Sequence, residues 1–129
     1  MNREGQTFWI FLLLDNYAPM AYIQEMVFIE TSIFTKEVKR LIKDDEYKQL
    51  QSVILLRPEA GALIKGSGGL RKVRWKLRGE GKRGGLRVIY YFDPPDTVYM
   101  LLAYKKREQE DLTNKQIKFL CKLMKEWLS

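Results

Sequence analysis

The chain has 129 residues, 46% of them hydrophobic, which suits one domain with a buried core and argues against a disordered chain. It has no histidine and one cysteine, which excludes an internal disulfide, a Ser-His-Asp triad, a Cys-His pair and histidine zinc ligands. The net charge is +7, and residues 65–87 alone contain nine Lys or Arg and a single acid, Glu80. Positive charge confined to one segment is typical of a nucleic-acid-binding surface, whereas a solubilising surface usually mixes both signs.

The N-terminal segment contains FWIFLLL at residues 8–14, which is seven apolar residues where a membrane span needs about 20. It is also a poor signal peptide, because its one basic residue is offset by an acid and no A-x-A cleavage site follows. The pattern of a folded domain begins near Met26. We therefore expect residues 1–25 to be a non-essential extension, residues 26–129 to form the domain, and the protein to be cytoplasmic without membrane contact.

The first half of the predicted domain is mostly helical. Residues 26–30 favour a short strand, and the apolar residues of TSIFTKEVKRLI (31–42) then recur at helical spacing. A second helix begins at Asp44 or Asp45 and ends before a proline, which disfavours a helical residue in front of it. The two helices are joined by a short polar link and form a predicted helical hairpin.

Three predicted strands follow at residues 71–78, 86–92 and 98–105. The first alternates apolar and basic side chains, as a strand does when one of its faces is in solvent. The third is apolar on both faces and is therefore expected to be central. A capping box at Thr113 begins a last helix, on whose apolar side Cys121 is expected to be a buried structural thiol. The order β-α-α-β-β-β-α predicts an α+β domain, an antiparallel sheet with its helices packed on one face.

Two glycine-rich stretches resemble nucleotide-binding motifs but lack the required context. GEGKRG (79–84) matches G-x-G-x-x-G, yet a strand follows it and not a helix, so no helix N-terminus meets a phosphate. GALIKGS (61–67) lacks the Lys-Ser/Thr of a P-loop. The acids Glu108, Glu110 and Asp111 are interpreted as a solvated approach to the last helix and not as metal ligands. The sequence therefore predicts neither a cofactor nor a bound metal.

The strongest signal is a set of basic residues on the three predicted strands and their connections. If these strands are adjacent, the basic side chains meet at one end of the sheet, where arginine forks and lysine charges suit phosphate groups. Nearby tyrosines could stack an unstacked base, although core packing is the default interpretation of each one. The candidate RNA-binding residues are Arg71, Lys72, Lys76, Arg78, Arg83, Tyr104 and Lys105, and the same set of residues includes Arg74, Arg87, Lys106, Lys82 and Tyr91.

Three stretches, GGLRKVRW, GEGKRGGLRVIYYF and LLAYKKREQEDLT, resemble in their order the HigB branch of the RelE superfamily over about residues 26–129. The resemblance implies a small microbial-RNase-like fold and a bacterial toxin that cuts mRNA on the ribosome without metal or organic cofactor. It also implies a HigA-like helix-turn-helix antitoxin as partner, and contact with operator DNA only through the toxin–antitoxin complex. The antitoxin could cover the basic residues or bind elsewhere and block ribosome entry.

The resemblance also suggests roles for particular residues. Arg71 and Arg74 match the basic pair after the family's Gly-Gly-Leu, Lys82 and Arg83 its basic turn, and Arg87 the arginine that opens its next strand. Lys106 matches a basic residue after the last strand. The resemblance thus implies as candidate catalytic residues Arg74, Arg87, Lys106, Lys82 and Tyr91. In this chemistry the RNA 2′-OH is the nucleophile, so Arg and Lys need only orient the phosphate and stabilise its developing charge.

One departure from the family leaves the general base open. Better-known RelE members have a tyrosine a few residues past the last basic group, where this chain has Leu112. Tyr91 or Tyr104 could take its place, and so could a lysine crowded by arginines. A catalytically silent RNA-, ribosome- or antitoxin-binding module is the alternative function. DNA binding by the chain itself is disfavoured, because no predicted helix carries the basic cluster.

Overall fold

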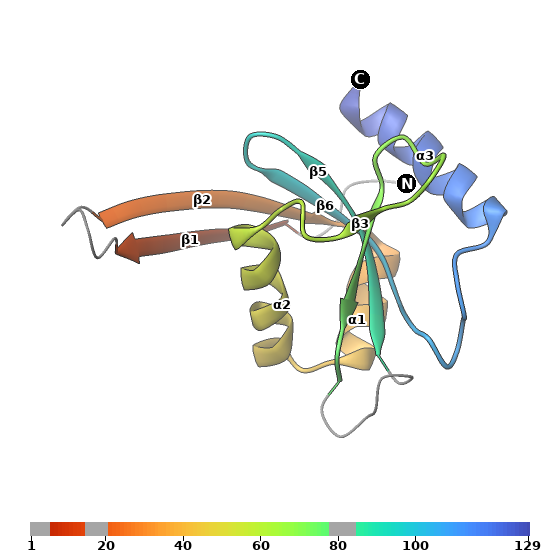
Figure 1. Ribbon diagram of the computed structural model, residues 1–129, viewed down its shortest axis with the longest axis horizontal. Helices are drawn as coiled ribbons and strands as arrows, with labels where there is room; N and C mark the ends of the chain where they lie inside the picture. The colour runs from red at the N-terminus through yellow and green to blue at the C-terminus, as the bar shows by residue number, and fades with distance from the viewer. Residues whose placement is uncertain (1–5, 15–20, 78–84) are drawn as a thin grey trace.

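The computed structural model describes residues 6–14, 21–77 and 85–129, with side chains from Met26 onward. Figure 1 shows the arrangement of its strands and helices. In chain order the elements are β1 (Gln6–Leu14), β2 (Ala21–Glu30), α1 (Ser32–Leu41), α2 (Asp44–Leu56), β3 (Ala62–Leu63), β4 (Arg71–Trp75), β5 (Leu86–Asp93), β6 (Thr97–Lys105) and α3 (Asn114–Leu128). Among these described segments, no helix is both long enough and apolar enough to cross a membrane.

The strands of the described segments form one six-stranded sheet in the order β1-β2-β6-β5-β4-β3. The prediction that the third strand of the meander is central is confirmed, because β6 lies between β2 and β5. The pairs are antiparallel apart from β2 and β6, which run parallel with Val27 opposite Thr97. The α+β class is confirmed, and the predicted order matches apart from two added strands, β1 and the two-residue β3.

The helices begin where the sequence places capping side chains. The Thr31 side chain accepts a hydrogen bond from the Phe34 N–H and caps α1, which satisfies one of the free amide groups at the start of the helix. At α3, the Thr113 side chain accepts from the Gln116 N–H, and the Gln116 side chain accepts from the Thr113 N–H. This is the predicted capping box, which fixes where α3 starts.

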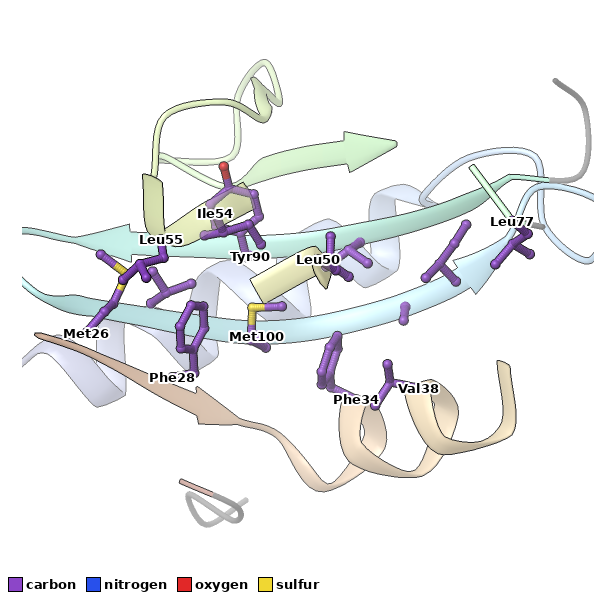
Figure 2. Close-up of a cluster of buried hydrophobic side chains, with 14 residues drawn as sticks. Met26, Phe28, Phe34, Val38, Leu50, Ile54, Leu55, Leu77, Tyr90 and Met100 are labelled. Carbon is purple, nitrogen blue, oxygen red and sulfur yellow. The ribbon is translucent and has the colours of Figure 1, made fainter. Parts of the chain in front are cut away.

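The first face of the sheet is covered by α1 and α2, as Figure 2 shows. Phe34 from α1 and Leu50 and Ile54 from α2 pack against Phe28 of β2 and Met100 of β6, and all five are fully buried. The apolar positions of β4 and β5 complete this core from the other end of the sheet: Val73, Trp75, Leu86, Val88 and Tyr90. Each strand contributes alternate residues, as expected for one face of a pleated sheet.

The second face is covered by α3, so the expectation that all helices pack on one face is not met for this helix. Leu120 and Met124 of α3 pack with Ile89, Tyr99 and Leu101, which are the alternate residues of β5 and β6. The physical reason is that the central strands are apolar on both faces, and each face must be removed from water. The helices thus enclose the sheet from two sides.

The dispensability of residues 1–25 stays a prediction, which a chain starting at Met26 tests by its ability to fold.

Candidate nucleic-acid interface

Strands β4, β5 and β6 are neighbours in the sheet, and their pairing brings several predicted basic residues to one end of the second face. Arg74 pairs with Arg87 across β4 and β5, and Arg87 pairs with Tyr104 across β5 and β6. Two positions along from that second pair, just past the end of β6, the Lys106 N–H donates to the Gly85 carbonyl at 3.1 Å, which extends the pairing of β5 and β6.

Side-chain alternation settles which basic residues share this face. Val73, Trp75 and Leu77 pack in the core under α1 and α2, so the residues between and before them point to the opposite side. Tyr104 packs in the α3-side core, and the same alternation places Lys106 on its side of the sheet. We call this set the basic face: Lys72, Arg74, Lys76, Arg87 and Lys106. Like charges directly opposite each other destabilise a sheet, so the Arg74–Arg87 pair is unfavourable in the protein alone.

Arg87 is the most deeply placed cation of the basic face. It is only 6% exposed, yet no acidic side chain within the described residues forms an ion pair with it. Its Nη1 lies 3.4 Å from the Leu86 carbonyl oxygen, a long contact for a hydrogen bond. A Cβ at Gly85 would lie 2.8 Å from the same Nη1, so the missing side chain of Gly85 makes room for the guanidinium. A buried cation without a paired acid is costly, which makes Arg87 a candidate for function.

Tyr104 lies beside Arg87 and is also buried, with 6% of its surface exposed. Its hydroxyl is enclosed and has no hydrogen-bond partner in the described part of the chain. Burial, followed by the charge of Asp111, raises the pKa of Tyr104, while Arg87 opposes the shift. The phenol therefore keeps its proton at neutral pH. Because the ring packs in the core, it offers no open surface for the predicted stacking of a base.

Asp111 is a residue of this region that the sequence reasoning missed. It lies in the connection between β6 and α3, where it was interpreted as a solvated acid, but its Oδ1 is 3.4 Å from Lys72 Nζ. The Leu112 N–H donates to the same carboxylate at 2.8 Å, which lowers the pKa of Asp111, and Lys72 adds to this effect. The side chain of Asp111 is 68% exposed and so remains accessible from solvent. The connection is thereby held beside the basic face.

Two predicted RNA-binding residues point to the other side of the sheet. Arg71 precedes Val73 by two residues, and its Nη1 donates to the carbonyl groups of Glu59 at 3.1 Å and Gly61 at 2.8 Å. It therefore holds the connection after α2 in place. Lys105 lines a hollow with residues of the α1–α2 side, because it alternates with its neighbour Tyr104. The expectation that these two join the other cations at one surface is corrected by strand alternation.

Tyr91, a predicted catalytic residue, lies on the second face but far along β5 from Arg87. The two are separated by four positions, or about 13 Å at the rise of a strand. Its ring instead approaches Gly69, at which an added Cβ would come within 2.9 Å of the ring. The structure therefore does not bring Tyr91 to the basic face. Arg78, Lys82 and Arg83 lie outside the described residues.

The chemistry of the basic face suits the binding of an anion and the stabilisation of negative charge. Arg74 and Lys76 are exposed, Lys106 is half-buried and Arg87 lies below them, so a phosphodiester could be contacted at two depths. Fixed positive charges of this kind stabilise negative charge that develops on a reacting phosphate. In the portion of the chain with described side chains, no group of three His, Cys, Asp or Glu side chains could hold a metal ion.

Comparison with known families gives one match over most of the chain. A family model described as the RelE toxin of the RelE / RelB toxin-antitoxin system matches residues 26–129. The matched segment contains α1 to α3, every strand from β3 to β6, and every residue of the basic face.

Proposed function

The chain belongs to the RelE toxin family, whose members are toxins of type II toxin–antitoxin pairs, and from this premise we propose that it is a ribosome-dependent endoribonuclease that cleaves mRNA. Its partner is an antitoxin. We further propose that the toxin is of the HigB branch, with a HigA-like helix-turn-helix antitoxin through which the pair contacts operator DNA. The three stretches quoted from the sequence support this finer assignment.

The single observation that carries the proposal is that Arg87 is buried without a paired acid among the described residues. An arginine that is 6% exposed, faces another arginine and has no acid in ion-pair contact among the described residues destabilises the protein in isolation. A bound phosphodiester would supply the missing negative charge and turn this arrangement into a favourable one. Planar guanidinium groups also match phosphate oxygens in pairs, which suits Arg74 and Arg87 better than lysines.

The proposed reaction uses the nucleophile that RNA carries. The 2′-OH attacks the adjacent phosphorus while its proton is removed, the bond from phosphorus to the 5′-oxygen breaks, and the leaving oxygen takes up a proton. Arg87 and Arg74 stabilise the extra negative charge on the phosphate in the transition state, and Lys106 holds the same phosphate from the neighbouring strand. Tyr104 acts as a positioning residue that packs against Arg87, since its own hydroxyl is enclosed. Lys72 and Lys76 contact flanking phosphates.

Dependence on the ribosome is supported by the openness of the basic face. Arg74 and Lys76 of this face are exposed, and Lys106 lines a hollow with the four residues that follow it in the chain. An open surface binds a flexible single strand without fixing the 2′-OH in line with the phosphorus, and orientation is a large part of such catalysis. We propose that the ribosome supplies the opposite wall by holding the mRNA against the basic face.

The experiment is to add the protein to a translating extract and to map the 5′ ends of the mRNA fragments with and without ribosomes. We expect cuts only on ribosome-bound message, and a loss of about 10²–10³ in cleavage rate for Arg87→Gln. Lys106→Gln and Lys105→Gln form a matched pair, because the two lysines are neighbours in sequence but project from opposite faces. We expect the first to lower the rate by tenfold or more and the second to leave it within about twofold.

Two results would contradict the proposal. Intact mRNA in the presence of folded wild-type protein that still binds ribosomes would instead show a non-catalytic binding module. Equal losses for Lys105→Gln and Lys106→Gln would show that the basic face is not the reacting surface.

A further inference from the structure

We propose that Asp111, on the connection between β6 and α3, is a specificity-determining residue that accepts hydrogen bonds from the Watson–Crick edge of an mRNA base and selects guanine over uracil. This inference rests on the proposed function in that the ligand of the basic face is single-stranded RNA. It adds a contact to a base, whereas the proposed contacts of the basic face are to phosphates.

An acid at this position weakens the binding of phosphate groups. The Oδ1 of Asp111 lies 3.4 Å from Lys72 Nζ, so it occupies one cation of the basic face and brings a negative charge beside it. The contact contributes little to stability, because it joins a largely exposed side chain to a lysine at the surface. Asp111 is not needed to begin α3 either, since the capping box of Thr113 and Gln116 does so. A carboxylate that opposes phosphate binding and adds little stability indicates a second kind of contact.

The carboxylate of Asp111 is held in one orientation. Its Oδ1 accepts from the Leu112 N–H at 2.8 Å and from Lys72, which uses the acceptor sites of this one oxygen. The main chain is fixed as well, because Gln109 Nε2 donates to the Asp111 carbonyl at 2.8 Å and to Gln116 Oε1 at 2.6 Å. A ligand that binds Asp111 therefore spends little of its binding free energy on ordering the side chain or the connection.

The second carboxylate oxygen of Asp111, Oδ2, is open to a ligand. It has no hydrogen bond or ion pair with any residue that the structure describes, and the side chain is 68% exposed. The Leu112 N–H, and then Lys72, lower the pKa of Asp111, so the carboxylate is ionised at neutral pH and can accept hydrogen bonds but donate none. Its partner must therefore supply N–H or O–H donors. A phosphodiester has no such donor, whereas the edges of the bases do.

The four bases of RNA differ in the donors that they present to such an oxygen. Guanine has two neighbouring donors on its Watson–Crick edge, the N1–H and the N2 amino group, and both can reach one carboxylate oxygen. Cytosine and adenine have one amino group beside a ring nitrogen, which is an acceptor and is repelled by a carboxylate. In uracil the N3–H lies between two carbonyl oxygens, so an approaching carboxylate is repelled from both sides. The expected order of preference therefore begins with guanine and ends with uracil.

Asp111 lies near enough to the basic face for the selected base to belong to the bound segment of RNA. Its partner Lys72 is two residues from Arg74 on β4, or about 7 Å along the strand, and Arg74 pairs with Arg87. Asp111 and Arg87 also act with opposite sign on the pKa of one phenol, that of Tyr104. A base next to the phosphate at Arg87 is therefore within reach of Asp111, and a base held there helps to place that phosphate.

The test uses the full chain and ribosomes that hold messages in which each nucleotide beside the mapped cut is changed in turn to G, A, C or U. For the wild type we expect cleavage to be about tenfold faster or more with guanine than with uracil at one of these positions. In Asp111→Asn the amide nitrogen takes the place of Oδ2, because the Leu112 N–H and Lys72 require an acceptor at Oδ1. An acceptor thus becomes a donor, and the preference for guanine should fall to within about twofold or reverse. Glu110→Gln is the matched control, since it removes the same charge from an exposed neighbour and should keep the wild-type ratio.

A second measurement does not depend on cleavage and so separates this inference from the proposed function. Short single strands with every 2′-OH methylated cannot supply the nucleophile, and fluorescence anisotropy at constant salt measures their affinity. A strand with one guanine should bind the wild type about fivefold or more tightly than the same strand with uracil, and Asp111→Asn should bind the two within about twofold. This preference without any cleavage of mRNA would contradict the proposed function and support the inference.

Two results would overturn the inference while mRNA is still cleaved. One is a wild-type protein that treats guanine and uracil alike in both measurements. The other is an unchanged ratio in Asp111→Asn, including a rate that falls equally for all four bases, which would assign Asp111 to the placement of the phosphate and not to the choice of base. A protein that neither cleaves mRNA nor binds any of the strands would overturn both proposals. Both substitutions change exposed side chains, so both variants are expected to fold.

Discussion

The two faces of the sheet differ in the side chains that they carry and in how far helices cover them. The α1–α2 face carries one apolar core that extends from Met26 at one end to Leu77 at the other, under α1 and α2. The α3 face is divided, with apolar residues under the helix and the basic face beyond it. The first arrangement maximises the area removed from water, whereas the second gives up part of that stabilisation to keep cations accessible. The comparison predicts that most of the stability comes from one face of the sheet and the proposed activity from the other, and the following changes test this division.

The largest effect is expected on the α1–α2 face. Phe34→Ala removes a fully buried ring between α1 and the sheet and should lower the free energy of unfolding by about 3–5 kcal/mol. Denaturant unfolding followed by circular dichroism measures the change. The control is Leu63→Ala, at a side chain that is 63% exposed on the edge strand β3, for which the change should stay within about 0.5 kcal/mol. Equal losses for the two variants would mean that the core is not where the stability lies.

At Arg87 we expect a large loss of the proposed activity without a loss of stability. Arg87→Met removes the buried cation but keeps an apolar side chain of similar length, so the rate of mRNA cleavage should fall by about 10²–10³. The free energy of unfolding should rise by about 1 kcal/mol, since no buried charge remains. Parallel unfolding and cleavage assays check both statements. A large loss of stability would show that Arg87 is a structural residue and would remove the division between the faces.

A smaller effect is expected from Gly85→Ala, which displaces the guanidinium without deleting it. The added Cβ would lie 2.8 Å from Arg87 Nη1 and 3.2 Å from the Trp75 carbonyl oxygen, so the arginine must shift. We expect cleavage to slow by about tenfold, because misplacing a charge by a fraction of an ångström weakens its action in the transition state. In the Arg87→Met background the same substitution should have no further effect on the rate. An additive effect would show that Gly85 acts independently of Arg87.

The smallest effect concerns alkaline pH and belongs to the α1–α2 side. The Tyr47 hydroxyl donates to the buried Glu30 carboxylate at 2.5 Å. Burial first, and then the charge of Glu30, raises the pKa of Tyr47 far above its ordinary value of 10.0. The raised pKa of Tyr47 adds to the free energy of unfolding, and this contribution is complete below pH 10. It is lost as the pH rises further, because the phenol releases its proton in the unfolded chain but keeps it in the folded chain.

Tyr47→Phe should therefore reduce the fall of the unfolding free energy above pH 10 by about 1.4 kcal/mol per pH unit. Urea unfolding at several pH values between 8 and about 11 measures the slope. Tyr90 and Tyr104 also have raised pKa values, so part of the slope should persist in the variant. An unchanged slope would mean that the Tyr47 phenol ionises equally in the folded and unfolded states.

Sequence periodicity predicted the faces of the individual strands correctly. The alternation of Val73 and Trp75 with Arg74 already indicates one apolar and one basic face, and the structure keeps both. The same alternation assigns Arg71 to the side of Val73 and Trp75. The resemblance instead grouped Arg71 with Arg74 as a basic pair, which led to its prediction as an RNA-binding residue. Similarly, Ile89 and Tyr91 show that β5 has a second apolar face, which is the signal for a helix on that side.

Contacts between residues far apart in the chain could not be predicted from the sequence, because they depend on strand register and on the path of the loops. No local pattern places Arg74 opposite Arg87, since a shift of two residues keeps every side chain on its face but changes its partner. The contact between Lys72 and Asp111 joins residues 39 positions apart, through a connection without regular structure. The role of Gly85 depends on where the Arg87 guanidinium lies, and a glycine next to a turn is ordinarily assigned to the turn.

The parallel pairing of β2 with β6 also bears on synthesis of the chain. Val27 and Thr97 are 70 positions apart, so β2 can pair with β6 only after β6 has been synthesised. Contacts of such long separation form late. Because Arg87, Tyr104 and Lys106 come from the final third of the chain, an unfinished nascent polypeptide has no assembled basic face. Any activity that depends on the basic face can therefore begin only when translation of the chain is nearly complete.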